Sequence, residues 1–126
     1  MKQTKFVITL LLLAASFSTV RLATAADVEA GLLAVSALGS LNGQALACSE
    51  LKVAMRAKAL MLAHAPKTQR FGDAYEDATK AAYAEQLRPD STCPDSIQLT
   101  QRANELAFRL TDTLPVIAPA ANNTTR

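Results

Sequence analysis

Few residues in this chain are of a type that does chemistry. Histidine occurs once, as His64, so histidine-based catalysis or metal binding would depend on it alone. Met61 lies three residues earlier, on the same side of a helix, and a methionine–histidine pair is a ligand set that suits copper. The same pair suits a helix end, where methionine packs and an imidazolium is favoured by the helix dipole. We therefore expect no metal or other cofactor, with copper binding by Met61 and His64 as the alternative.

The usual catalytic groups are also missing. No serine stands in the G-x-S-x-G or S-x-x-K context of acyl-transfer enzymes. Four carboxylates cluster between Thr68 and Pro89, at a spacing typical of a solvated helix face: Asp73, Glu76, Asp77 and Glu85. The sequence therefore predicts a protein that is not an enzyme.

Two cysteines, Cys48 and Cys93, are the remaining reactive side chains. They do not form a C-x-x-C redox motif, and both follow a segment typical of export, which leads to a compartment where thiols pair. We expect a structural disulfide between them.

One short segment concentrates positive charge beside an aromatic ring. It runs from His64 to Gly72 and includes Pro66, which makes it a turn between helices. An ordinary turn explains it, and a partner-binding tip is the functional alternative. The candidate binding residues are His64, Lys67, Arg70 and Phe71.

The N-terminus has the three parts of a secretory signal peptide, which we place at residues 1–25. Two lysines flank the start, an apolar stretch runs from Phe6 to Val20, and Ala23-Thr24-Ala25 forms a small-residue cleavage site. The apolar stretch is shorter than the ~20 residues that a membrane-spanning helix needs, which favours cleavage. Arg21 lies between the stretch and the cleavage site and leaves retention of the segment as the alternative. The mature protein should therefore be periplasmic or extracellular, without a stable membrane anchor.

Cleavage changes the charge balance of the protein. Three of the thirteen basic residues lie in the predicted signal peptide, which leaves ten basic against eleven acidic residues. The basic pI of 8.7 thus belongs to the precursor, and charge gives no support for nucleic-acid binding.

Composition and periodicity predict an all-α fold. Tryptophan is absent and aromatic residues make up 5% of the chain, which favours closely packed helices over a sheet core. A first helix is expected over Val28–Leu38, capped by Asp27 and interrupted at Gly39-Ser40. Asn42-Gly43 is a second breaker, so this helix and the next are either two helices or one kinked helix.

The next helix is expected from about Gly43 to Ala65. It carries apolar residues on two opposite faces, so we place it at the centre of the bundle. The faces are Cys48, Leu51, Met55, Ala59 and Leu62 on one side, and Leu46, Val53, Ala57, Leu60 and Met61 on the other.

Two more helices complete the domain. One begins at Thr68 or Gly72 and ends at Arg88-Pro89. The last is capped by Asp95 or Ser96, with Gln98 placed to complete a capping box, and Pro115 ends it. Its apolar stripe is Leu99, Ala103, Leu106, Leu110 and Leu114.

Short connections imply that the last three helices run up, down and up, which brings Cys48 and Cys93 to the same end. The expected structure is a small three- to four-helix up-down bundle, stapled by one disulfide, over residues 26–115. The tail 116–126 contains a polar run without apolar periodicity and is expected to be disordered.

These features favour a non-catalytic interaction module, such as an adaptor, an inhibitor or an immunity-type protein, which binds another envelope or secreted protein. The layout, with one cysteine near a helix start and Cys93-Pro94 leading into the last helix, resembles that of helical periplasmic immunity proteins that neutralise amidase effectors of type VI secretion. The alternative function is a carrier of a small ligand or of copper in the bundle interior, using Met61 and His64.

Overall fold

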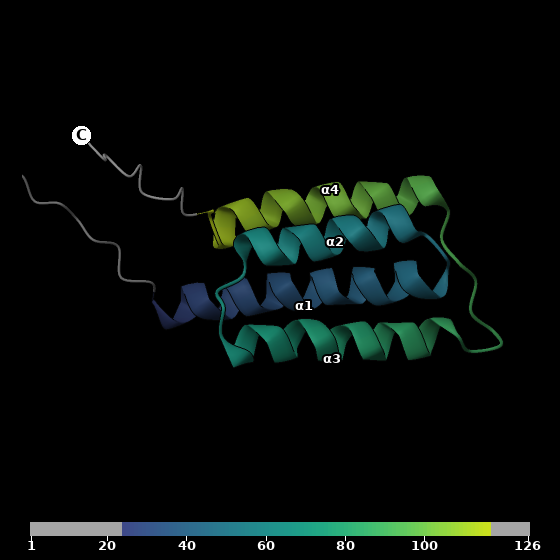
Figure 1. Ribbon diagram of the computed structural model, residues 1–126, viewed down its shortest axis with the longest axis horizontal. Helices are drawn as coiled ribbons and strands as arrows, with labels where there is room; N and C mark the ends of the chain where they lie inside the picture. The colour runs from purple at the N-terminus through teal and green to yellow at the C-terminus, as the bar shows by residue number, and fades with distance from the viewer. Residues whose placement is uncertain (1–23, 117–126) are drawn as a thin grey trace, which may run out of the picture.

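The computed structural model describes residues 24–116, and within that range the chain forms four helices and no strand. They are α1 (Ala25–Ala47), α2 (Leu51–His64), α3 (Gln69–Gln86) and α4 (Ser96–Thr113). Successive helices run in opposite directions (Figure 1). The predicted all-α, up-down bundle with one disulfide is confirmed. The predicted signal peptide, apart from its last two residues, and the predicted tail beyond Val116 lie outside the described residues.

The first helix is the centre of the fold. α1 packs against each of the other three helices, and α2 and α4 also pack against each other. The fully buried side chains of α1 include Val35, Leu38 and Leu41, which meet Leu99 and Leu110 of α4 in the core. The expectation that the segment from Gly43 to Ala65 lies at the centre is therefore wrong, because α1 occupies that place.

The interruption predicted at Gly39-Ser40 is also wrong, since α1 continues to Ala47; of the two alternatives for Asn42-Gly43, the chain passes through it within one helix and does not turn there. The chain turns at Cys48 to Glu50, where Ser49 adopts a positive φ of 60°. At the other end, Thr24 is the N-cap and forms a reciprocal capping box with Asp27, so Asp27 is the third residue of the helix and not its cap. Leu46 thus belongs to α1, and α2 is a shorter helix than predicted.

The two glycines inside α1 serve close packing rather than a turn. A Cβ atom at Gly39 would collide with the carbonyl oxygen of Tyr75, and one at Gly43 with that of Thr79. Both collisions are with the backbone of α3, which a side-chain rotation cannot relieve. The hydroxyl of Thr79 donates to the carbonyl oxygen of Gly39 at 3.1 Å across the same contact. Absence of a side chain is what lets the two helix backbones approach so closely.

The later helices match their predicted limits within two residues. Asp95 caps α4 by accepting from the backbone N–H of Gln98 at 2.8 Å, as expected. The five residues of the predicted α4 stripe all join the core or pack against it. Thr68 is the N-cap residue of α3, and that helix ends at Gln86.

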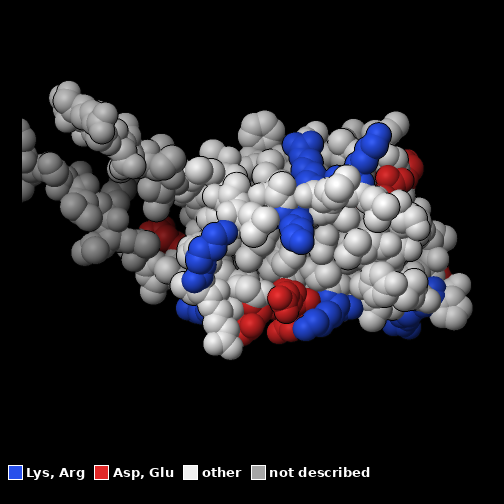
Figure 2. All heavy atoms as spheres, viewed as in Figure 1, with Lys and Arg blue, Asp and Glu red and all other residues white. Residues whose placement is uncertain are grey.

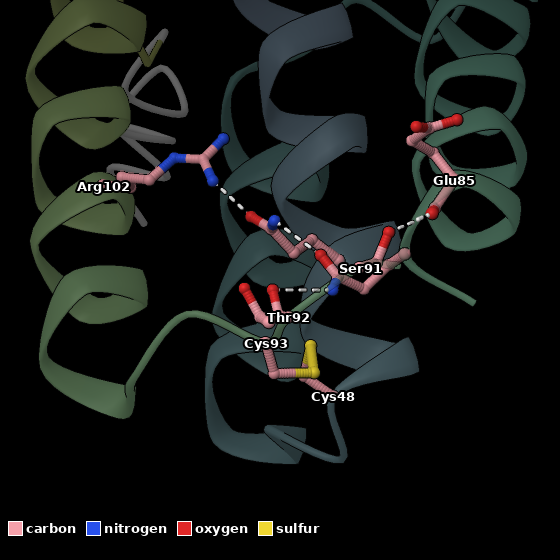
Figure 3. The surroundings of a disulfide bond; sticks show 8 residues. Cys48, Glu85, Ser91, Thr92, Cys93 and Arg102 are labelled. Atoms are coloured by element: carbon pink, nitrogen blue, oxygen red, sulfur yellow. Dashed lines mark hydrogen bonds between the residues drawn. A yellow bond between two sulfur atoms is a disulfide. The ribbon is translucent and has the colours of Figure 1, made fainter. Parts of the chain in front are cut away.

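The disulfide joins the end of α1 to the loop before α4. The Sγ atoms of Cys48 and Cys93 are 2.06 Å apart and the Cα atoms 5.7 Å apart, at the end of the bundle away from the predicted binding turn (Figures 1 and 3). The predicted pairing is confirmed.

Substituting Gly43 tests the close α1–α3 contact. Gly43→Ala should lower the free energy of unfolding by about 1 to 3 kcal/mol, because the helices must separate to admit a methyl group. Gly72→Ala is the matched control, since nothing lies within 4 Å of the position that its Cβ would take. It should stabilise the protein by about 0.5 to 1 kcal/mol through helix propensity. Urea denaturation measures both, and an equal response of the two variants would contradict the packing role.

Reduction of the disulfide should destabilise the fold strongly. The bond closes a loop with a sequence separation of 45, for which chain entropy predicts a contribution of about 4 kcal/mol. The double variant Cys48→Ser/Cys93→Ser and the reduced wild type should therefore show the same large fall in melting temperature. A melting temperature that reductant leaves unchanged would refute this.

Candidate functional site

The four residues of the predicted binding turn all have partners within the fold. The Nδ1–H of His64 donates to the carbonyl oxygen of Leu114 at 2.7 Å, which ties the end of α2 to the end of α4. Lys67 donates to the carbonyl oxygen of Leu62 at 2.7 Å, a cation at a helix C-terminus. Arg70 pairs with Glu29 of α1 at 3.4 Å, with both side chains exposed.

Phe71 was predicted to be a binding residue of this turn, but its ring does not lie on the surface. Its side chain is only 5% exposed and belongs to the hydrophobic core. Contacts within the chain explain the positions of all four residues, so no binding partner is needed to explain them. Binding of another protein by this turn stays a prediction.

The copper alternative also stays a prediction, with less geometric support. Met61 is half-buried and packs against the core. The Nδ1 of His64 is already engaged with Leu114. Within residues 24–116, no three His, Cys, Asp or Glu side chains gather so as to hold a metal ion.

A groove that the sequence did not predict lies between α2 and α3. Figure 1 shows α1 between these two helices, and the groove has α1 as its floor and α2 and α3 as its walls. It has a volume of about 470 Å³, within the range of ligand pockets. The lining is Asn42 and Leu46 from α1, Leu51, Ala54, Met55 and Lys58 from α2, and Tyr75, Glu76, Thr79 and Lys80 from α3.

Apolar side chains that the fold does not cover lie along this groove. Leu51 is 62% exposed and Met55 is 65% exposed, although both stand on the stripe of α2 that the sequence placed in the core. Figure 2 shows an uncharged strip on this face, between basic residues over α2 and mixed charges over α3. The prediction that both faces of α2 are buried is wrong, because only the face toward α1 and α4 has neighbours.

Charged side chains stand at the rim of the groove. Lys80 lies 3.9 Å from both Glu76 and Asp77 of its own helix. Lys58, on the other wall, makes no ion pair within the described part of the chain. The groove therefore combines apolar walls with a cation that has no local counter-charge.

Tyr75 places a buried hydroxyl beside the groove. Its Oη has no hydrogen-bond partner among the described residues, and burial raises the pKa of Tyr75 to about 12. A buried hydroxyl without a partner costs free energy, so this residue is a local weakness in the α1–α3 packing.

On the side of α1 that faces α3 and α4 near the disulfide, polar side chains form a chain of hydrogen bonds. Arg102 of α4 donates to Gln44, Gln44 donates to Gln86 of α3 at 2.8 Å, and Gln86 donates to the carbonyl oxygen of Thr92 at 3.0 Å. Figure 3 shows this chain of contacts running from α4 across α1 to the loop that carries Cys93. It links α4, α1 and α3 to the disulfide loop, beside a second pocket of about 210 Å³ that is smaller than the groove between α2 and α3.

No family model matches this chain. No curated protein and no solved structure matches it either. The groove was not identified from the sequence, since an apolar stripe at helical spacing predicts burial whether the neighbour is in the same chain or in another. The one signal in the sequence was that the segment containing α2 carries apolar residues on two opposite faces.

Replacing Tyr75 tests the orphan hydroxyl. Tyr75→Phe should raise the free energy of unfolding at neutral pH by about 1 kcal/mol, because it removes a buried hydroxyl that has no partner. The raised pKa favours the folded state fully below pH 10, and this contribution is lost as the pH rises through about 12. Tyr75→Phe should therefore also lose less stability between these two pH values than wild type. Tyr83→Phe, at an exposed tyrosine, is the control for denaturation at both pH values, and identical behaviour of the two variants would count against the assignment.

Proposed function

We propose that this chain is an exported, non-catalytic interaction module that binds another protein through the groove between α2 and α3. The single observation that carries the proposal is the exposed apolar lining of a groove whose walls, α2 and α3, are held apart by α1. Exposed apolar side chains that gather along one groove suit an interaction site better than those scattered singly over the surface. The disulfide and the predicted signal peptide at residues 1–25 support export, to the periplasm or the extracellular space.

An amphipathic helix is the kind of partner element that suits this shape. Two walls on a helical floor form the seat into which a further helix lays its apolar face. Among the described residues α1 alone is long and apolar enough to span a membrane, and half of that stretch is buried as the core of the bundle. The apolar composition of α1 is therefore accounted for by its place in the core.

Met55 provides the test. Tagged mature protein is incubated with the exported fraction of its source, and retained proteins are identified by mass spectrometry. Met55→Glu should reduce the retained partner at least about tenfold, since a charge would be buried against apolar surface. Phe108→Glu is the matched control, because Phe108 is somewhat more exposed than Met55 but lies on α4 and does not line the groove, and it should retain as much partner as wild type.

The proposal fails on either of two results. One is that wild type retains no stoichiometric partner. The other is that Met55→Glu and wild type retain the same partner to the same extent.

A further inference from the structure

The exposed apolar residues of α2 form one stripe that is longer than the groove. Leu51, Met55 and Leu62 are 62%, 65% and 59% exposed, and Lys58 lies between the last two. The four positions follow one another at intervals of four, three and four residues, which keeps them on one face of the helix. Leu51, Met55 and Lys58 line the groove, whereas Leu62 lies beyond its lining. The surface that a partner would cover is therefore elongated along α2.

This spacing is that of the a and d positions of a heptad repeat, the pattern by which one α-helix packs along another. Leu62 comes eleven residues after Leu51, which is about 17 Å along the helix. A small ligand confined to the groove would leave Leu62 exposed, whereas a helix of about four turns laid along α2 would cover the whole stripe. The shape of the exposed apolar surface therefore favours a helical partner.

Lys58 is the charge in the groove that has no counter-charge. The lining carries two lysines and one glutamate, which leaves a net of one positive charge. On the wall formed by α3, Lys80 is 3.9 Å from Glu76. Lys58 makes no ion pair with any residue that the structure describes. A partner that covers Lys58 must therefore bring a negative charge, because an ammonium group buried without one costs much of the binding free energy.

From this pattern we propose that the occupant of the groove is an amphipathic helix of another protein, with an apolar heptad face and one Asp or Glu at the level of Lys58. The inference rests on the proposed function, since it uses the same groove and names the chemistry of its partner. A lysine in an otherwise apolar helix seam fixes the register of the two helices and selects the partner, at a cost in stability. Lys58 thus determines specificity, while Leu51, Met55 and Leu62 supply the apolar contact.

Two synthetic helical peptides test the acidic position. Each has about three heptads with leucine at a and d, except for one central d position, which is glutamate in one peptide and lysine in the other. Fluorescence anisotropy measures the binding of each labelled peptide to the mature protein, at peptide concentrations below those at which it self-associates. Wild type should bind the glutamate peptide about tenfold or more tightly than the lysine peptide. Lys58→Glu should reverse this preference, because it inverts the charge that the peptide meets.

Lys52→Glu is the matched control, since it makes the same charge change on α2 but lies on the side facing α4. It should keep the wild-type preference. Equal binding of the two peptides by wild type, or a preference that Lys58→Glu leaves unchanged, would overturn the acidic position. Binding of neither peptide would overturn the helical partner. Uptake of the neutral dye Nile red that depends on Met55 would then assign the groove to a small ligand, and sedimentation of wild type as a dimer would assign it to a second copy.

Retention of partner from the exported fraction separates this inference from the proposed function. Lys58→Glu should lower the retained partner about tenfold, as Met55→Glu does, and Lys52→Glu should not. If Met55→Glu lowers it and Lys58→Glu does not, the acidic position fails and the proposed function stands. If Met55→Glu does not lower it, both fail.

Discussion

The contact between the backbones of α1 and α3 at Gly39 and Gly43 is the constraint on which the rest of the structure depends. The approach is possible only because two residues, four apart on one face of α1, have no side chain. It anchors α3 to α1 and not to α2, although α2 is its neighbour along the chain. The position of α3 in turn decides that a groove remains between α2 and α3. The groove lies directly beside this contact, since Tyr75 and Thr79 of α3 take part in both.

The two sides of α1 differ in the kind of side chain that they present. On the side of α4, a run of hydrogen bonds through Gln44 and Gln86 joins three helices to the loop that holds Cys93. Because these polar groups already hydrogen-bond to one another, few of their donors and acceptors are left for a binding partner. On the side of α2, apolar side chains line an open groove. The disulfide ties the end of α1 to the loop before α4, whereas α2 and α3, the walls of the groove, pack on α1 and little on each other.

Sequence reasoning succeeded where a local rule and the global fold agreed. Asp95 predicted the start of α4, Pro115 followed its end, and the two cysteines predicted the end of the bundle at which they meet. It failed at Gly39 and Gly43, because glycine marks both a turn and a close approach, and only the neighbouring helix distinguishes them. It failed on α2 because periodicity shows that a face is apolar but not what covers it. The second failure hid the candidate site.

The capping box at the start of α1 bears on the order of events during export. Thr24 and Asp27 bond to each other's backbone, and the predicted cleavage site follows Ala25, inside the first turn that these bonds close. Proteolysis acts on chain that is open, and not on a closed helical turn. Cleavage at the predicted site and folding of α1 would therefore compete for the same few residues. The predicted cut after Ala25 would remove Thr24 and put the positive charge of a new N-terminus in place of a side-chain cap, which would weaken the first turn of the helix at the centre of the bundle.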